Sequence, residues 1–202
     1  HIVEAVVKAT DIPVTVKIRK GWDEKNVNAV EVARVAQESG AFAVAVHGRT
    51  KNQMYSGKAD LDIIAEVKQA LNIPVIGNGD IDSGESCKHM YDYTGCDRGR
   101  VGRAACGRPW IFSEIKHYLE TGETLPPPSP DEQLDIMNEH IRLLCADKGE
   151  YIGMKEARKH TAWYLKGRPG AAKLRNMCGS LSTLEDFDNM LTLIRNTAQQ
   201  DI

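Results

Sequence analysis

The sequence lacks any recognisable pairing of cysteines. Its 202 residues include five cysteines, at positions 87, 96, 106, 145 and 178, so none belongs to a C-x-x-C motif. An odd number of widely spaced cysteines argues against both a disulfide framework and a zinc site. We therefore expect buried or incidental thiols, no bound metal and a reducing, cytoplasmic environment.

Long apolar stretches are also lacking. No apolar run approaches the roughly 20 residues that a helix needs to span a bilayer, and the sequence does not start with a signal-peptide pattern. Hydrophobic residues make up 42% and charged residues 27% of the sequence, which is typical of a soluble globular protein. We expect no membrane partner. Because the first residue is His1 rather than methionine, we also expect a fragment of a longer protein.

The sequence lacks a large net charge, but positive charge is concentrated in one window. The net charge of −2 gives no indication of a nucleic-acid partner. Between Tyr151 and Arg175, however, the sequence has seven Lys or Arg residues and a single acidic residue, Glu156. Such asymmetry is typical of a surface that binds a polyanion, although a solvated helix face has the same composition.

Strand-like and helix-like patterns alternate over the first 120 residues. The strand-like runs cover residues 12–19, 42–47, 74–78 and 98–101. Alternation of this kind predicts a parallel sheet built from βα units. A closed (β/α)8 barrel needs eight strands, so four units predict half of a TIM barrel.

Helix start and stop signals lie between these strands. Asp23 is expected to cap a helix that Gly40 closes and that has Val27 among its apolar positions. Asp60 and Ser83 are expected to precede the next two helices. A further helix is expected to begin at Pro109.

The remainder of the chain has a different pattern. Residues 122–130 contain four prolines and predict a stiff linker. Apolar residues then recur at helical spacing, a helix is expected at about 155–166, and Ser182 with Glu185 predicts a capping box for the last helix. The expected domains are therefore a half barrel at 1–121, a linker at 122–130 and an all-α helical bundle at 131–202.

Two strand ends carry candidate ligand-binding side chains. Lys17 alternates with Val16 and Ile18, so it is expected to point into the barrel, where it would meet either an anionic ligand or a neighbouring carboxylate. His47 ends the second strand after inward-facing alanines, which would leave room for a flat ligand. A single histidine at a strand end is a weak signal by itself.

The next two strand ends are rich in glycine. The third strand ends in the run 77–80, which includes Asn78, Gly79 and Asp80, and the fourth ends at Gly102 and Arg103. Glycine frees the backbone to approach an anion, and barrels commonly bind phosphate after their last two strands. Such loops are also ordinary turns, but the pair predicts a phosphate site.

Five runs together make the sequence similar to the tRNA-dihydrouridine synthases, and most of all to the bacterial B-type. They occur in the same order and at the same spacing as in that family. A helical tail with Arg158, Lys159, His160, Trp163 and Tyr164 follows them. The runs are Val14–Trp22, Val46–Thr50, Tyr55–Gly57, Ile76–Asp80 and Gly102–Ala105.

The resemblance implies an oxidoreductase that reduces uridine in tRNA to 5,6-dihydrouridine, with FMN as cofactor and NADPH as reductant. The reacting base is flipped out of the RNA in such enzymes. Carried over by position, the residues implied to bind the cofactor are Lys17, His47, Asn78, Gly79, Asp80, Gly102 and Arg103. Those implied to contact RNA are Arg49, Lys155, Arg158, Lys159, His160 and Trp163.

The sequence departs from the family pattern at several points. It contains no Asn-x-Gly-Cys-Pro motif, which carries the family's catalytic cysteine, and it has no counterpart of the first four barrel strands. We therefore assign no catalytic residue and expect the chain to be inactive alone. Arg98 and Arg100 stand where the family has small or apolar residues, and Arg108 replaces an asparagine. Parity predicts that Arg98 and Arg100 point inward, where an unpaired buried guanidinium is costly.

Two alternatives remain open. The chain could be another FMN-binding barrel, such as a dihydroorotate-type or ene-reductase-type enzyme, although the basic helical tail argues against that interpretation. It could also be a non-enzymatic RNA-binding fragment with the half barrel as scaffold. The sequence predicts neither the oligomeric state nor the position of the modified uridine.

Overall fold

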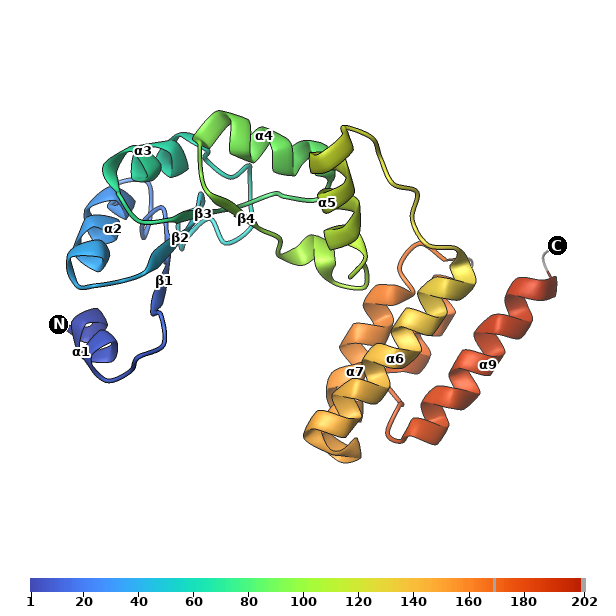
Figure 1. Cartoon of the computed structure of the whole chain (residues 1–202). Coiled ribbons are helices and arrows are strands. Elements are labelled where there is room, and N and C mark those ends of the chain that lie inside the picture. Colours follow the sequence, from blue (N-terminus) through green and yellow to red (C-terminus); the bar gives the residue numbers. More distant parts are fainter. Residues whose placement is uncertain (169, 201–202) are drawn as a thin grey trace. The chain divides into compact units, whose positions relative to one another are not determined.

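The computed structural model describes residues 1–168 and 170–200 (Figure 1). Strands and helices alternate in its first half, and helices alone follow. In chain order the elements are α1 (Ile2–Lys8), β1 (Thr15–Arg19), α2 (Ala29–Glu38), β2 (Ala43–His47), α3 (Asp62–Ala70), β3 (Val75–Asn78), α4 (Gly84–Thr94), β4 (Arg98–Arg100), the 3-10 turn η1 (Arg103–Ala105), α5 (Ile111–Thr121), α6 (Pro130–Lys148), α7 (Glu150–Tyr164), α8 (Ala171–Cys178) and α9 (Leu184–Gln200).

The chain divides into two compact units. The sheet unit comprises residues 1–104 and 111–125, and the helical unit comprises residues 105–110 and the chain from 126 onward. The chain therefore crosses between the units three times, whereas the sequence predicted a single linker. Helix α5 belongs to the sheet unit, although the segment just before it belongs to the helical unit.

The sheet is parallel, with its four strands in the order β1-β2-β3-β4. Each connection between neighbouring strands contains a helix, and α2, α3 and α4 lie along one side of the sheet (Figure 1). A parallel pair needs such a crossover because its strands run in the same direction. This arrangement confirms the predicted α/β class and is consistent with part of a (β/α) barrel.

Side-chain alternation gives the sheet two different faces. The side chains of Val44, Val46 and Val75 point toward the helices and are fully buried, with Ile64 and Val67 of α3 in the same core. The other face carries two rows of aligned residues, which we call the cationic face. Its rows are Lys17, Ala45, Ile76 and Arg98, followed by Arg19, His47, Asn78 and Arg100.

The structure confirms one helix cap predicted in the sheet unit and contradicts another. Ser83 caps α4 as predicted, because its hydroxyl accepts the backbone N–H of Ser86 at 3.2 Å. The prediction that Asp23 caps α2 is wrong. Its carboxylate instead accepts N–H groups of Lys25 and Asn26 within a turn, and α2 begins only at Ala29.

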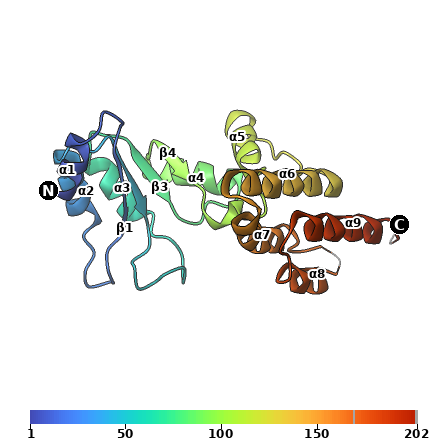
Figure 2. The same cartoon turned by 90° about the horizontal axis from the view of Figure 1, so that it is seen from below.

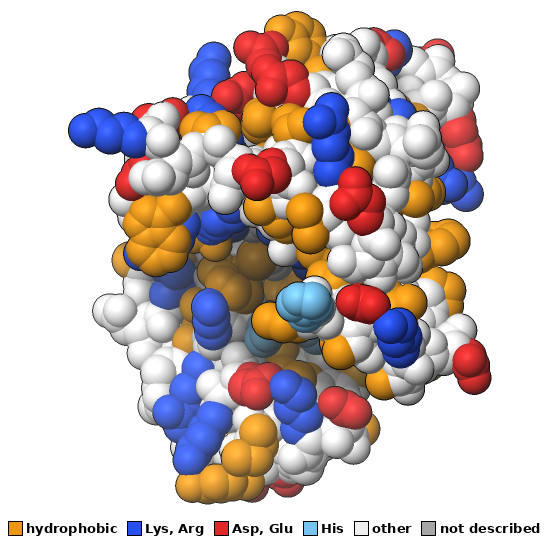
Figure 3. All heavy atoms as spheres, turned by 90° about the vertical axis from the view of Figure 1, so that its left-hand side faces the viewer, with side chains coloured by type: hydrophobic (Ala, Val, Ile, Leu, Met, Phe, Trp, Pro, Cys, Tyr) orange, Lys and Arg blue, Asp and Glu red, His pale blue; other side chains and the backbone are white. Residues whose placement is uncertain are grey.

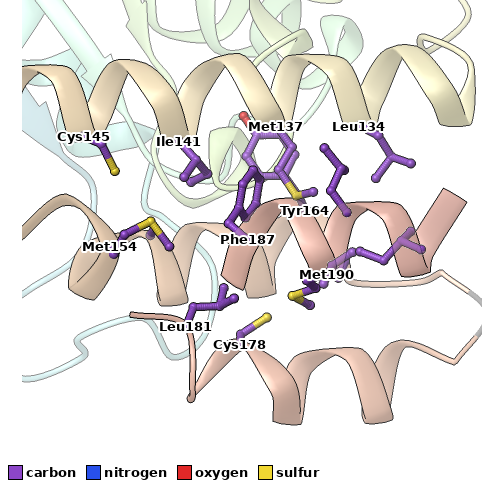
Figure 4. Close-up of a cluster of buried hydrophobic side chains, with 14 residues drawn as sticks. Leu134, Met137, Ile141, Cys145, Met154, Tyr164, Cys178, Leu181, Phe187 and Met190 are labelled. Atoms are coloured by element: carbon purple, nitrogen blue, oxygen red, sulfur yellow. The ribbon is translucent and has the colours of Figure 1, made fainter. Parts of the chain in front are cut away.

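A core of apolar side chains from α6, α7 and α9 fills the helical unit (Figure 4). Met137 and Ile141 of α6 and Phe187 of α9 are fully buried. Helix α6 begins at Pro130, inside the predicted linker, because Ser129 accepts the backbone N–H of Glu132 at 3.3 Å and proline suits the first turn. Helix α8 was not predicted, since only Cys178 among its eight residues is buried.

The segment 105–110 packs against the end of α7 in the helical unit. A Cβ at Gly107, which has a φ of +73°, would lie 2.4 Å from the carbonyl carbon of Trp163. Only glycine fits there, for reasons of both backbone angle and space. The ring of Trp110 packs at 6.2 Å from that of Tyr164. These contacts explain why this segment belongs with helices that follow it in the sequence.

The cap of the last helix differs from the predicted one. The carboxylate of Asp186 accepts the backbone N–H groups of Ser182 and Thr183, both at 2.9 Å. The hydroxyl of Thr183 accepts the N–H of Asp186 in return, at 3.1 Å. The predicted box of Ser182 with Glu185 is therefore shifted by one residue, because the sequence offers two adjacent hydroxyl residues and two adjacent acids.

Candidate functional site

Lys17 lies in the middle of β1 on the cationic face. Its side chain is solvent-exposed overall, yet partial burial of the ammonium group lowers its pKa, and the charges of Arg100 and Arg19 lower the pKa further. Cations therefore crowd this part of the sheet. Figure 3 shows Lys and Arg side chains beside apolar ones on the side of the molecule that carries α1 and β1. An anionic or electron-rich group bound here would relieve the mutual repulsion of these cations.

His47 ends β2 in the second row of the cationic face and is 7% exposed. Burial lowers its pKa to about 4; the charges of Arg19, Lys17 and Arg49 act in the same direction, and the charge of Asp80 opposes them. The imidazole is consequently neutral at pH 7. It can donate a hydrogen bond from one ring nitrogen and accept one at the other.

Arg49 follows β2 and is 2% exposed. Its two terminal nitrogens each donate to one carboxylate oxygen of Asp80 at 2.8 Å. Its Nε donates to the carbonyl oxygen of Ser56 at 3.1 Å, and Nη2 also donates to that of Gly57 at 2.6 Å. With these acceptors the guanidinium group connects the loop after β2 to the end of β3. Because it is buried, it is not accessible to a phosphate group from solvent.

Asp80 and Gly79 form a tight turn after β3. Partial burial opposes the charge of Asp80, but hydrogen bonds from Arg49 and from the backbone of Ala59 outweigh it, so the pKa of the carboxyl is lowered. Asp80 has a φ of +54°, which is uncommon for a residue with a side chain. At Gly79, with a φ of +142°, a Cβ would lie 2.4 Å from that of Ala59, so only glycine fits.

Asn78, Gly102 and Arg103 complete this edge of the sheet. The amide of Asn78 donates to the carbonyl oxygen of Arg100 at 2.9 Å and so joins the ends of β3 and β4. Gly102 has open space around its Cα, and the guanidinium of the exposed Arg103 lies 3.4 Å from Asp80. The structure thus gathers all seven residues predicted to bind the cofactor in the sheet unit, at the carboxyl ends of the strands or just before them.

Four residues form a stripe along α7, which we call the α7 stripe: Tyr151, Lys155, Lys159 and Trp163. They are spaced four residues apart and share one side of the helix. The Nζ of Lys155 lies 3.9 Å from the ring centroid of Tyr151, and that of Lys159 lies 4.7 Å from the ring centroid of Trp163. Alternating cations and aromatic rings suit a surface that contacts phosphates and bases.

Arg158 and His160 have structural partners within the helical unit. The Nε of Arg158 donates to the carbonyl oxygen of Leu181 at 2.7 Å, which ties α7 to the start of the last helix. The ring of His160 lies 4.8 Å from that of His140 and 5.3 Å from that of Trp163. Partial burial lowers the pKa of both histidines. These contacts leave Lys155 and Lys159 as the exposed cations of the predicted set.

Arg98 and Arg100 occupy the cationic face as parity predicted, but both are exposed. Arg98 donates to the carbonyl oxygen of Asp97 at 2.8 Å. The predicted cost of a buried unpaired guanidinium therefore does not arise in this structure, because solvent reaches the face on which both side chains lie.

The sequence matches the family model described as dihydrouridine synthase over residues 1–201. That span covers nearly the whole chain. The chain belongs to the dihydrouridine synthase family.

Curated relatives agree with this assignment. The tRNA-dihydrouridine synthase B of Pseudomonas putida is 50% identical over 195 residues, which cover 96% of this chain and 57% of the relative. Those of Pseudomonas syringae pv. tomato and Vibrio vulnificus are 50% and 51% identical and cover 98% and 87% of this chain. This dihydrouridine synthase family member thus spans a little over half the length of the relatives that it matches.

Some site residues of this family member were missed in the sequence. Arg19 shares the parity of Lys17 and donates to the carbonyl oxygens of Thr50 and Met54, at 2.9 and 3.2 Å. Its parity was a signal that could have identified it. Trp22 and Tyr55 carry cations over their rings, but both lie in loops without periodicity, so only the structure reveals these pairs.

Three further observations concern metal ligands, membrane-spanning helices and cysteines. Within residues 1–168 and 170–200, no group of three or more His, Cys, Asp or Glu side chains could hold a metal ion. In the same part of the chain, no helix is long and apolar enough to cross a membrane. Four of the five cysteines are buried, and Cys106 alone is exposed.

Proposed function

We propose that this chain is the C-terminal portion of an enzyme that reduces uridine to 5,6-dihydrouridine in tRNA, with FMN as cofactor and NADPH as reductant. In this proposal the sheet unit is half of a (β/α)8 barrel, and the helical unit binds tRNA in the cytoplasm. The match to the dihydrouridine synthase family over residues 1–201 carries the proposal. The relatives' shared name, tRNA-dihydrouridine synthase B, supports the substrate and the reaction.

The cationic face suits a flat, anionic cofactor. Ala45 presents only a methyl group between Lys17 and Ile76, which leaves a shallow surface along the first row. Arg103, exposed beside Gly102, offers a cation and open space for a phosphate. The net charge of the Arg49, Asp80 and Arg103 cluster is positive, because one carboxylate faces two guanidinium groups. These features fit FMN.

The residues have distinct proposed roles. Bound FMN would supply hydride transfer to the uracil ring. Lys17 would favour negative charge on the ring system, and neutral His47 would orient the pyrimidine portion of the cofactor or the substrate by hydrogen bonding. Asn78 and Gly79, with Gly102 and Arg103, would hold the ribityl chain and phosphate.

The family resemblance implied that Asp80 binds the cofactor, but in this proposal Asp80 has a structural role. Its carboxylate would repel a phosphate, and both of its oxygens already accept hydrogen bonds from Arg49. We infer that Asp80 fixes the turn at Gly79 and orients Arg103, which lies 3.4 Å from its Oδ1. The phosphate would then meet Arg103 and backbone N–H groups rather than Asp80 itself.

The α7 stripe favours tRNA over a small-molecule substrate. A flavin barrel for small molecules has no need of a helix with two cation–aromatic pairs. A purely RNA-binding fragment would have no need of the tight turn at Gly79 or of a buried, neutral His47 at the sheet edge. One experiment separates the three functions: purify a full-length protein containing this chain, record flavin absorbance, and incubate with NADPH and unmodified tRNA. Flavin absorbance with dihydrouridine in the tRNA supports the proposal, flavin with no tRNA product favours another flavin barrel, and tRNA binding without flavin favours the non-enzymatic fragment.

A further inference from the structure

Two loops at the carboxyl ends of β1 and β2 expose large aromatic side chains. Trp22 in the first loop is 58% exposed, and Tyr55 in the second is 54% exposed. Each ring carries a cation: the Nζ of Lys51 lies 4.4 Å from the ring centroid of Trp22, and the guanidinium carbon of Arg103 lies 4.3 Å from that of Tyr55. We call these four residues the rim. The rim belongs entirely to the sheet unit.

Hydrogen bonds between the two loops hold the rim in place. The backbone N–H of Lys51 donates to the carbonyl oxygen of Gly21 at 2.9 Å, and that of Asn52 donates to the carbonyl oxygen of Trp22 at 3.0 Å. Arg19 adds bonds to two carbonyl oxygens of the second loop. Both loops project from the same side of the sheet in Figure 2. A ligand of the rim would therefore meet rings whose backbone is already fixed, which lowers the entropy cost of binding.

The chemistry of the rim matches unpaired nucleotides. A ring that is more than half exposed has surface on which a base can stack, and stacking is available only when the base is not already stacked inside a duplex. Lys51, beside the ring of Trp22, suits the phosphate that a nucleotide carries. A protein partner would also cover exposed aromatic rings, but it would not in general supply an anion to Lys51 beside them.

We propose that the rim binds unpaired nucleotides of the RNA substrate, with bases against the rings of Trp22 and Tyr55 and a phosphate beside Lys51, while Arg103, assigned to the cofactor phosphate, holds the ring of Tyr55 in place. This inference rests on the proposed function, since it assumes that RNA reaches this edge of the sheet. It goes beyond that function by assigning a preference for unpaired over paired RNA to four residues remote in sequence from the α7 stripe.

The test measures binding of two labelled RNA probes to the purified chain. One is an unpaired oligouridine of about 12 nucleotides, within the size range of single-strand sites, and the other is a duplex of the same length. We expect tighter binding of the unpaired probe. Replacing Trp22→Ala or Tyr55→Ala should weaken it by at least about fivefold for each ring, whereas Trp22→Phe and Tyr55→Phe should retain most of the affinity.

Phe42→Ala provides the matched control. Phe42 is 57% exposed and precedes β2, at the opposite end of the strand from the rim, so its loss should leave RNA binding unchanged. Far-ultraviolet circular dichroism of each variant checks that the fold survives. Emission from Trp22 gives a second readout, because unpaired RNA should quench it in the parent and the quenching should be reduced in the Trp22→Phe variant.

The outcomes separate the rim from the proposed function. If the parent binds tRNA but the rim variants bind the unpaired probe as tightly as the parent does, the rim inference is overturned and the proposed function stands. Equal affinity for the unpaired and duplex probes also overturns it. If the parent binds neither probe nor tRNA, RNA recognition by this chain is overturned as a whole, and self-association lost in the Trp22→Ala variant would identify the rim as a contact between copies.

Discussion

Arg49 and Asp80, 31 positions apart in sequence, form a bidentate ion pair with both nitrogen–oxygen distances at 2.8 Å. The pair joins the loop after β2 to the turn after β3, and the arginine is almost completely buried. It thereby fixes two of the strand ends at which the proposed cofactor site lies. In the proposed function this pair builds the site, and its neighbours contact the ligand.

The first prediction concerns removal of the carboxylate of that pair. Asp80→Ala would leave the guanidinium of Arg49 buried without a counter-charge, so we expect the free energy of unfolding to fall by about 3 kcal/mol. This is the low end of the range for a broken buried pair, because the Asp80 side chain is itself 38% exposed. Urea denaturation of the purified chain measures the change.

Asp92→Ala is the control for that experiment. Lys88 and Asp92 form an ion pair on α4 with side chains 54% and 61% exposed, and an exposed pair contributes at most about 1 kcal/mol. A loss of stability in the Asp80 variant no larger than that in the Asp92 variant would show that Arg49 does not depend on its partner.

Local patterns in the sequence predicted most of the helices and strands. They could not predict contacts between residues that are far apart in the sequence. The first three strands were predictable because their apolar residues lie against the helices α2 to α4, and the cap at Ser83 was predictable because it is local. Asp23 was misassigned because a short polar side chain serves a turn as well as a helix start. Helix α8 was missed because a short helix with one buried residue shows no periodicity.

The candidate site was also only partly predictable from the sequence. Strand ends predicted where Lys17 and His47 would lie, since alternation assigns a side chain to one face. The arrangement of the loops could not be inferred, because it depends on hydrogen bonds between segments about 30 residues apart. The burial of Arg49 against Asp80 and the cation over the ring of Trp22 therefore could not be predicted from the sequence.

The second prediction concerns Lys17 in a full-length protein containing this chain. Lys17→Ala should weaken FMN binding by about 10-fold or more, because a hydrogen bond from a charged donor contributes roughly 1.5–3 kcal/mol. Fluorescence titration of the apoprotein with FMN measures the dissociation constant. Lys116→Ala, on the exposed side of α5, is the control and should have no effect. Unchanged FMN binding in the Lys17 variant would assign this lysine a structural role.

The third prediction concerns the pH dependence of stability at His47. Its pKa is lowered to about 4 in the folded protein, so between pH 6.5 and 4 the unfolded chain binds a proton that the folded chain does not. Stability should therefore be lost as the pH falls through this range, by at most about 1.4 kcal/mol per pH unit from this group. Above pH 6.5 His47 contributes no dependence. Urea denaturation at several pH values should show a shallower acid slope for His47→Gln, and an identical slope would contradict the prediction.

The fourth prediction concerns the α7 stripe. Lys155→Ala with Lys159→Ala should weaken tRNA binding and reduce the slope of log affinity against log salt by roughly 1 to 2, because each phosphate contact contributes about 0.7–0.9 to that slope. Arg158→Ala should act differently, because it removes the hydrogen bond to Leu181. It should lower the free energy of unfolding and leave the salt slope of tRNA binding nearly unchanged. Filter binding of tRNA over a salt series distinguishes the two variants. A double lysine variant with the parent's slope would locate the docking surface elsewhere.

The last prediction concerns activity of the 202 residues on their own. The family resemblance implies that a cysteine in an Asn-x-Gly-Cys-Pro motif donates a proton to C5 of uracil. None of the five cysteines in this chain lies in such a motif. Burial raises the pKa of Cys87, Cys145 and Cys178, which makes these thiols still less suited to proton transfer. We therefore expect no dihydrouridine when the chain is incubated with FMN, NADPH and unmodified tRNA. Mass spectrometry of the digested tRNA is the measurement, and a tRNA-dihydrouridine synthase of the relatives' full length is the positive control. If dihydrouridine does form, Cys106→Ser tests whether the exposed thiol supplies the proton: lost activity would assign it that role, and retained activity would require a donor other than Cys106.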